Sequence, residues 1–381
     1  MLTPKEKFFL FKQSKHFCSV PWNHIKIGTD GSITTCLNGK YDLGNANDQD
    51  LDTVLHASDL VNLRKNLRQD LPDANCQHCR RLENTQDYSY KYLRDLYNPR
   101  FIKSTADYDN PNDFVLNGID LHWSSTCNLK CITCWPLQSS SIAQEMGEPI
   151  RHVPGPAAEK ITDFVVQNQH TLKEIYLSGG EPTLIKHNLN LLQRLRKDQD
   201  FLIRINTNLS FTDNNPVIEE LKKFPHVLVT ISADIADQNK FNYIRRGADW
   251  EVFIKNLTQL KKTHFSWRVN SVFFVATALH LAETQEYFME NFDIHDFTIN
   301  QVELGHTDLQ CRNLPGAVKQ QATIKLSAHK EKYQHNSNLV GQLENCLIEL
   351  QRPAEESYVK FFSDVDARAG TDWKTTFQEL Q

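Results

Sequence analysis

Short apolar runs alternate with longer amphipathic stretches between residues 115 and 310. Six runs rich in β-branched and aromatic residues are predicted to be strands, at 118–122, 174–177, 201–206, 226–232, 267–274 and 297–302. Helical periodicity separates several of them, at 157–169, 189–196, 250–263 and 281–291. This alternation favours β-α units around a parallel sheet. We therefore predict an α/β fold of six units, with its chemistry at the C-terminal ends of the strands.

The first 110 residues follow a different pattern. Asp30-Gly31 is typical of a hairpin turn between strands at 22–27 and 32–36, and a helical run follows at 59–68. The segment 104–113 is rich in Asp, Asn and Pro, which favour turns and discourage core packing. We place a domain boundary there. The prediction is a small cysteine-rich domain at 1–110, the α/β part at 115–310 and a mostly helical segment at 311–381.

Three cysteines, Cys127, Cys131 and Cys134, follow the first strand of the α/β part. Three thiolates this close in sequence can hold three corners of a [4Fe–4S] cube. The run has no fourth cysteine, so one iron would stay open to a small molecule. Structural zinc prefers four ligands, commonly as two pairs, and a thioredoxin-like pair lacks a third cysteine. The spacing therefore favours an iron–sulfur cluster over zinc or a redox pair.

A second motif, Gly179-Gly180-Glu181-Pro182, ends the second predicted strand. Glycine has no Cβ and lets the backbone approach a ligand, so free carbonyls and amides here could hold an amino acid head group. A Gly-Gly pair also marks ordinary strand-to-helix turns, and the motif alone does not decide between the two. It does fall on the same end of the sheet as the cysteine run.

Together, the C-x3-C-x2-C spacing and the Gly-Gly-Glu-Pro motif resemble the radical S-adenosylmethionine (SAM) superfamily. The resemblance implies a partial (β/α)6 TIM-like barrel with a small N-terminal domain. It implies that the three cysteines hold a [4Fe–4S] cluster whose open iron chelates the amino and carboxylate groups of SAM. It also implies that the glycine motif binds the amino group of SAM.

The same resemblance suggests further SAM contacts on the barrel rim. Thr207 and Asn208 would hydrogen-bond the ribose, and Ser232 and Arg245 would hold the methionyl carboxylate, since an arginine presents a planar fork of donors. Strand-end capping is the alternative for Thr207 and Ser232. Arg246 could equally be the carboxylate ligand.

Four more cysteines, Cys18, Cys36, Cys76 and Cys79, precede the predicted boundary. Four thiolates complete a coordination shell, which suits a second [4Fe–4S] cluster or tetrahedral zinc. Their spacing, C-x12-G-x4-C followed by C-x2-C, resembles half of a SPASM module, known as a twitch domain. This implies an auxiliary [4Fe–4S] cluster. The module precedes the barrel, as in the N-terminal twitch branch of the family.

Cys311 and Cys346 belong to neither set. A buried cysteine commonly serves as a small hydrophobe. The alternative for Cys311, which follows the last predicted strand, is catalytic. There it would donate a hydrogen atom to a substrate radical, as in some peptide epimerases.

Composition narrows the function further. A net charge of −5 over 381 residues gives no general attraction to nucleic acid or anionic membrane. Nine cysteines clustered by spacing indicate metal ligation in a reducing compartment. The N-terminus lacks a signal-peptide pattern, and the longest apolar stretch, 272–279, is far short of a membrane span. We expect a cytoplasmic protein with no nucleic-acid or membrane partner.

The resemblance implies an enzyme that reductively cleaves SAM to methionine and a 5′-deoxyadenosyl radical, which abstracts hydrogen from a substrate. Twitch and SPASM relatives often modify ribosomally made peptides or oxidise carbohydrates and aminocyclitols. We expect a peptide substrate first and a carbohydrate or aminocyclitol metabolite second. A non-catalytic iron–sulfur protein is the third hypothesis. An electron donor such as flavodoxin or ferredoxin is the implied partner.

Overall fold

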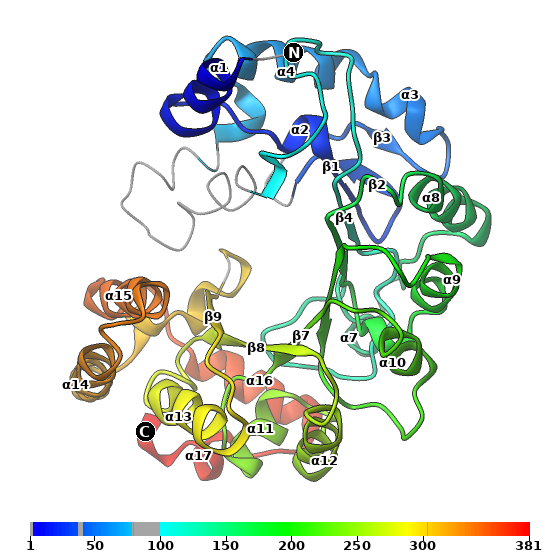
Figure 1. Cartoon of the computed structure of the whole chain (residues 1–381). Coiled ribbons are helices and arrows are strands. Elements are labelled where there is room, and N and C mark those ends of the chain that lie inside the picture. Colours follow the sequence, from blue (N-terminus) through cyan, green and yellow to red (C-terminus); the bar gives the residue numbers. More distant parts are fainter. Residues whose placement is uncertain (1–2, 37–40, 78, 80–99, 303) are drawn as a thin grey trace. The chain divides into compact units, whose positions relative to one another are not determined.

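The computed structural model describes residues 3–36, 41–77, 79, 100–302 and 304–381. Residues 37–40 and 80–99 of the predicted N-terminal domain lie outside the described residues. The chain divides into two compact units (Figure 1), each of which is built from several segments. The first contains Met1–Cys127, Pro136–Asn206 and Thr212–Leu228, and the second contains Asn128–Trp135, Thr207–Phe211 and Val229–Gln381.

The sheet of the first unit has the strand order β3-β2-β1-β4-β5-β6. The strands are β1 (His24–Ile27), β2 (Ser32–Thr34), β3 (Gly44–Asn45), β4 (Gly118–Leu121), β5 (Glu174–Leu177) and β6 (Leu202–Thr207). β1 pairs antiparallel with β2 but parallel with β4, and Ile25 lies opposite Ile119. β4, β5 and β6 are parallel to one another. The N-terminal hairpin therefore continues the sheet of the α/β part, which the sequence did not predict.

The hairpin turn itself is confirmed. The N–H of Gly28 donates to the carbonyl of Ser32 at 2.8 Å, and the N–H of Gly31 donates to the carbonyl of Gly28 at 3.0 Å. Gly31 has a φ of +84°, in the left-handed region that favours glycine. The turn therefore requires the glycine of Asp30-Gly31.

The helices of the first unit follow from capping and apolar spacing. They are α1 (Pro4–Phe8), α2 (Val20–Asn23), α3 (Leu51–Leu55), α4 (Ser58–Arg68), α7 (Ser140–Met146), α8 (Gly155–Gln167), α9 (Lys186–Arg194) and α10 (Pro216–Leu221). Ile161 and Val165 lie one turn apart on α8, and both are fully buried. Figure 1 shows α8, α9 and α10 along one side of β4, β5 and β6. Six residues of these strands are fully buried and form the core: Ile119, Leu121, Ile175, Leu177, Ile203 and Ile205.

Tyr108 corrects the prediction that 104–113 stays out of the core. Its side chain is buried, and its ring lies edge-on to Phe17 and Trp22, with ring centroids 5.6 Å apart in both pairs. The amide of Asn23 donates to its hydroxyl at 3.0 Å, so burial leaves the polar end satisfied. One aromatic residue thus fixes this turn-rich segment to the N-terminal core.

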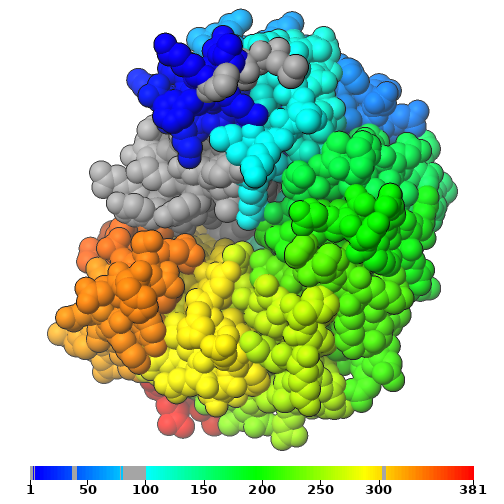
Figure 2. All heavy atoms as spheres, in the orientation of Figure 1, coloured from blue at the N-terminus to red at the C-terminus, as the bar shows by residue number. Residues whose placement is uncertain are grey.

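The second unit carries the last strands and the C-terminal helices. Its strands run in the order β7-β8-β9, and β8 pairs parallel with β9. The elements are β7 (Val227–Ser232), most of which lies in this unit, α11 (Gln238–Ile244), α12 (Trp250–Leu260), β8 (Ser266–Phe273), α13 (Leu281–Phe292), β9 (Phe297–Gln301), α14 (Gly316–Lys332), α15 (Ser337–Gln351), α16 (Val359–Ala369) and α17 (Trp373–Thr376). α14 and α15 pack side by side, and Figure 2 shows them at the surface.

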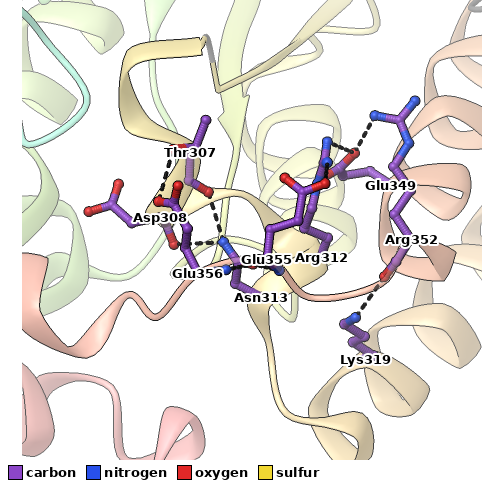
Figure 3. A network of polar contacts seen from close by, with 9 residues as sticks. All are labelled: Thr307, Asp308, Arg312, Asn313, Lys319, Glu349, Arg352, Glu355 and Glu356. Atoms are coloured by element: carbon purple, nitrogen blue, oxygen red, sulfur yellow. Dashed lines mark hydrogen bonds and ion pairs between the residues drawn. The ribbon is translucent and has the colours of Figure 1, made fainter.

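A polar network fixes the segment after β9 to the C-terminal helices (Figure 3). Arg312 donates to the carboxylates of Glu349 and Glu355, at 2.8 Å and 3.0 Å. The side-chain oxygen of Asn313 accepts the backbone N–H of Glu355 at 3.0 Å. The segment that follows β9 is therefore tied to the C-terminal end of α15 and the residues after it, within the second unit.

The fold class predicted from the alternation of strands and helices is confirmed. All six strands predicted between 118 and 302 are present, and their observed ends differ from the predicted ones by no more than one residue. The predicted boundaries of the three domains stay a prediction.

Candidate functional site

The glycine loop after β5 lies directly against the segment that leads into the cysteine run. The N–H of Gly180 donates to the carbonyl of Ser124 at 3.0 Å. A β-carbon built on Gly180 would stand 2.1 Å from the carbonyl oxygen of Thr126, which no side chain tolerates. Gly179 has a φ of +116°, and a β-carbon there would meet the Ser124 carbonyl at 2.6 Å. Both glycines are therefore required by the close approach of two loops.

Glu181 and Pro182 shape the same loop. The N–H of Glu181 donates to the Thr126 carbonyl at 2.7 Å, and its buried carboxylate accepts from the N–H and hydroxyl of Thr183 at 3.0 and 2.6 Å. It thereby caps the 3₁₀ helix Pro182–Leu184. The carbonyl of Pro182 accepts from the side chain of Asn188 at 2.9 Å. The SAM-binding role of these residues stays a prediction.

Two serines at the start of α7 hold Cys127. The hydroxyl of Ser140 accepts the N–H of Cys127 at 3.0 Å, and the hydroxyl of Ser141 donates to the Cys127 carbonyl at 2.7 Å. Ser139 caps α7 through the N–H of Ile142. The sequence reasoning missed these serines. Their signal was the Ser-Ser-Ser run before a helix, which is typical of an N-cap.

In the second unit, the cysteine run pairs with the chain that follows α11. The N–H of Lys130 donates to the carbonyl of Arg246 at 2.8 Å, and the N–H of Ile132 donates to the carbonyl of Ile244 at 2.9 Å. These two bonds flank Cys131 and Arg245 and set them opposite each other. The cysteine loop is therefore held by backbone contacts rather than by its sulfur ligands alone.

Arg245 itself is buried and contacts two groups. Its Nη2 lies 2.8 Å from Oδ2 of Asp234, and its Nη1 lies 3.9 Å from the Sγ of Cys131. Burial would lower the pKa of Arg245, but the charges of Asp234, Cys131 and Cys134 outweigh burial and raise it. The guanidinium therefore remains cationic. No sequence pattern assigned a role to Asp234.

The residues predicted to contact the ribose lie at the end of β6, where Thr207 is the last residue of the strand and Asn208 follows it. The side chain of Asn208 donates to that of Asn128 at 3.0 Å, and Asn128 donates to the carbonyl of Ser210 at 2.9 Å. The hydroxyl of Thr207 accepts the N–H of Leu209 at 3.1 Å, which is the capping arrangement considered as its alternative. Ser232 ends β7 and is partly buried. The SAM contacts of all three predicted residues stay predictions.

An aromatic pair follows the third cysteine. The rings of Trp135 and His306 are stacked, with centroids 4.0 Å apart and planes at 24°. Burial lowers the pKa of His306, so its ring is neutral near pH 7. His306 lies on the segment after β9, and no sequence pattern singled it out.

The N-terminal cysteines form one electrostatic group. Burial raises the pKa of the Cys18 thiol well above its usual range, and the charges of the other three cysteines, Cys76, Cys36 and Cys79, raise it further. Cys18 and Cys36 also pack against buried Val20 and Phe101. Four thiols gathered in an apolar setting fit the ligand set of an auxiliary [4Fe–4S] cluster. Cysteines in the described part of the chain form no disulfides.

Among the described residues, no three His, Cys, Asp or Glu side chains are grouped as the ligands of one metal ion would be. A cube takes one thiolate on each of its irons, so its ligands need not converge on a single point.

Comparison with known families identifies both parts of the chain. Residues 121–290 match the model of the radical SAM superfamily, and residues 18–80 match the SPASM model of an iron-sulfur cluster-binding domain. The chain therefore carries a radical SAM domain and an iron-sulfur cluster-binding domain. The two matches contain the two predicted cysteine sets, one in each. The radical SAM domain implies a [4Fe–4S] cluster and SAM, and the SPASM domain implies auxiliary iron–sulfur binding.

Several solved structures are similar to this chain. Native anSMEcpe with bound AdoMet is 20% identical, over 57% of this chain and 61% of that chain, with a TM-score of 0.43. SuiB of Streptococcus suis bound to S-adenosylmethionine is 14% identical, over 84% and 69%, with a TM-score of 0.42. HydG, a maturase of the [FeFe]-hydrogenase, is 10% identical, over 97% and 67%, with a TM-score of 0.37. The match spans about 60% of the length of anSMEcpe. Curated protein sequences give no significant match.

Cys311 and Cys346, which lie outside the two matched regions, are both fully buried. Burial raises the pKa of the Cys311 thiol well above its usual range, and the charge of nearby Cys346 raises it further. The role of Cys311 as a hydrogen-atom donor stays a prediction. No helix in the described part of the chain is long and apolar enough to cross a membrane.

Proposed function

We propose that the protein is a radical SAM enzyme that abstracts a hydrogen atom from a peptide substrate. The supporting observation is the contact between the glycine loop and the segment that leads into the cysteine run, where Gly180 lies against the Thr126 carbonyl. When bound, the reduced cluster supplies one electron that cleaves SAM to methionine and a 5′-deoxyadenosyl radical, which takes a hydrogen atom from the substrate.

The residues present fit the proposed groups. Cys127, Cys131 and Cys134 would hold the SAM-binding cluster, and the serines of α7 orient the first of them. The backbone of Gly179 and Gly180 leaves no room for side chains beside the cysteine run. The loop therefore holds the segment that leads into Cys127 in one conformation.

The auxiliary site belongs to the same proposal. Cys18, Cys36, Cys76 and Cys79 would hold a second [4Fe–4S] cluster, and the charge that each of the other three exerts on Cys18 supports this proposal. A complete set of four protein ligands suits electron relay. A flavodoxin or ferredoxin as electron donor and a cytoplasmic location complete the proposal.

A peptide is the first substrate class to test because twitch and SPASM modules accompany peptide modification in the family. One observation keeps a carbohydrate or aminocyclitol as the second. Side chains alternate between the two faces of β4, so Ile119 and Leu121 lie on one face. Asp120 and His122, the residue after the strand, lie on the other face. The Oδ2 of Asp120 and the Nε2 of His122 are buried without a hydrogen-bond partner among the described residues. Such groups suit a substrate rich in hydroxyls or amides.

The deciding experiment is anaerobic reconstitution followed by measurement of 5′-deoxyadenosine. With dithionite and SAM, the protein should release 5′-deoxyadenosine, and a variant with Cys127, Cys131 and Cys134 replaced by alanine should release none. A short peptide encoded beside the gene should accelerate release if the substrate is a peptide. Acceleration by a small polyol would favour the second class. No release by the fully loaded wild-type protein would leave only a non-catalytic iron–sulfur protein.

A further inference from the structure

Arg245 is placed against the cysteine run by the backbone, not by the conformation of its own side chain alone. The N–H groups of Lys130 and Ile132 donate to the carbonyls of Arg246 and Ile244, respectively. The two segments therefore run in opposite directions, as in an antiparallel pair. The two bonds leave Cys131 and Arg245 as the residues between them. A side chain at 245 therefore lies beside Cys131 whatever its length.

The guanidinium is locked in this place by a buried carboxylate. Asp234 follows β7 and is 1% exposed, and its Oδ1 accepts the N–H of Val272 at 2.8 Å. Its Oδ2 lies 2.8 Å from Nη2 of Arg245. The other terminal nitrogen, Nη1, lies 3.9 Å from the Sγ of Cys131 and donates to it. The cationic end of the pair thus faces the sulfur, and the anionic end faces β8.

This arrangement has a consequence for a cluster held by Cys131. Reduction adds a negative charge to the cluster, and hydrogen bonds and nearby positive charge stabilise the charged form. We propose that Arg245 is a positioning residue for the SAM-binding cluster. Its N–H···S contact with Cys131 raises the reduction potential of the cluster, and Asp234 orients the guanidinium. This inference rests on the proposed function, because it requires a cluster at Cys127, Cys131 and Cys134.

The inference replaces the role that the family resemblance gave to Arg245. Its two terminal nitrogens already contact Asp234 and Cys131, so a methionyl carboxylate would have to compete with a buried ion pair. The neighbouring Arg246 is less buried, and its backbone carbonyl accepts the N–H of Lys130. Arg246 is therefore the residue with which Arg245 is best compared when SAM binding is measured.

The test is an EPR-monitored redox titration without SAM or substrate. It compares wild type with Arg245→Gln, Arg245→Lys and Arg246→Gln, all at full iron content. A variant with the three cysteines of the cluster replaced by alanine supplies the signal of the auxiliary site for subtraction. We expect Arg245→Gln to lower the reduced-to-oxidised ratio at a fixed potential about tenfold, equal to about 59 mV for one electron. Arg245→Lys should lower this ratio less than Arg245→Gln does. Arg246→Gln should leave the ratio at its wild-type value.

A second measurement separates this role from SAM binding. The SAM dissociation constant, read from the EPR change on SAM addition, should stay within about twofold of wild type in Arg245→Gln. An unchanged potential in Arg245→Gln would overturn the inference, and so would a loss of SAM affinity alone. If Arg245→Gln does not load iron, the test uses Arg245→Lys, and an unchanged reduction potential in that variant would overturn the inference. If the EPR spectrum of the wild-type cluster does not change when SAM is added, the proposed function is refuted. The measurement of the reduction potential remains valid in that case.

Discussion

A β-carbon on Gly180 would stand 2.1 Å from the carbonyl oxygen of Thr126. Two loops that are more than fifty residues apart in sequence therefore meet at a point where only hydrogen fits. The obstacle is backbone and not a side chain that could rotate away.

Gly180→Ala should disrupt this junction. Overpacking of a fixed backbone costs about 1–3 kcal/mol, so we expect a lower melting temperature and at least tenfold weaker SAM binding. Calorimetry and SAM titration measure both. Gly316→Ala is the matched control, because a β-carbon at the start of α14 has no heavy atom within 4 Å. If the two variants behave alike, the junction is not rigid.

Replacing one N-terminal cysteine should remove one cluster. Wild type should hold about eight irons and eight sulfides per chain, and Cys76→Ala about four of each. Cys346→Ala should keep the wild-type count, because this cysteine is fully buried and belongs to neither predicted ligand set. Elemental analysis after anaerobic reconstitution provides the counts. About four irons with one zinc in the wild type would assign the N-terminal site to zinc.

The buried pair His24 and Asp120 should make stability depend on pH. The imidazole Nε2 lies 3.2 Å from Oδ1 of Asp120, and its Nδ1 lies 2.7 Å from the carbonyl of Thr35. Burial lowers the pKa of His24, but Asp120 and the Thr35 carbonyl outweigh burial and raise it. The contribution of the pair to the free energy of unfolding is therefore complete below a pH of about 6.5, the pKa of histidine in the unfolded chain. It is lost as the pH rises through the higher pKa of His24 in the folded protein.

The test compares wild type with His24→Gln by chemical unfolding. Near pH 6 the variant should lose about 3 kcal/mol, because a buried carboxylate loses its charged partner. Near pH 8.5 the difference should be smaller. A difference that grows with pH would mean that the histidine is neutral in the folded protein.

Arg312 should stabilise the packing of the C-terminal helices (Figure 3). Its contact with the largely buried carboxylate of Glu349 is lost in Arg312→Ala, which should cost about 1–3 kcal/mol. Lys360→Ala removes an exposed pair with Asp364 and should cost less than about 0.5 kcal/mol. Thermal unfolding of both variants checks the contrast. Equal melting temperatures would show that the network contributes nothing.

Cys311→Ala tests the predicted hydrogen-atom donor. If Cys311 only fills space, the variant should form the same product as wild type, with stability lowered by the loss of a buried sulfur. If it donates hydrogen, product should be lost while 5′-deoxyadenosine release continues. Cys346→Ala controls for the cavity, since that cysteine is equally buried. Unchanged product would remove the donor role.

The sequence predicted the strands and the class of chemistry because both depend on local patterns. Apolar runs of four to eight residues mark buried parallel strands, and cysteine spacing reflects the geometry of a cluster. The pairing of β1 with β4 could not be predicted, because strand neighbours depend on contacts between distant segments. Tyr108 was missed for a similar reason, since its partners lie near residues 17 to 23.

The assignment of single site residues was the weakest part. Arg245 and Arg246 are adjacent and chemically identical, and only the backbone pairing with the cysteine run shows which one lies beside Cys131. His306 has no motif and reaches Trp135 only through the fold. Side chains that contact a site from remote segments leave no local signal.

The parallel pairing of β1 with β4 has a practical consequence. A chain shortened to begin at residue 111 would uncover the outer edge of β4, a row of N–H and C=O groups ready to recruit another molecule. Aggregation is the expected fate of such a truncated protein. The two cysteine-bearing modules therefore must be produced together, and neither can be studied as an excised fragment.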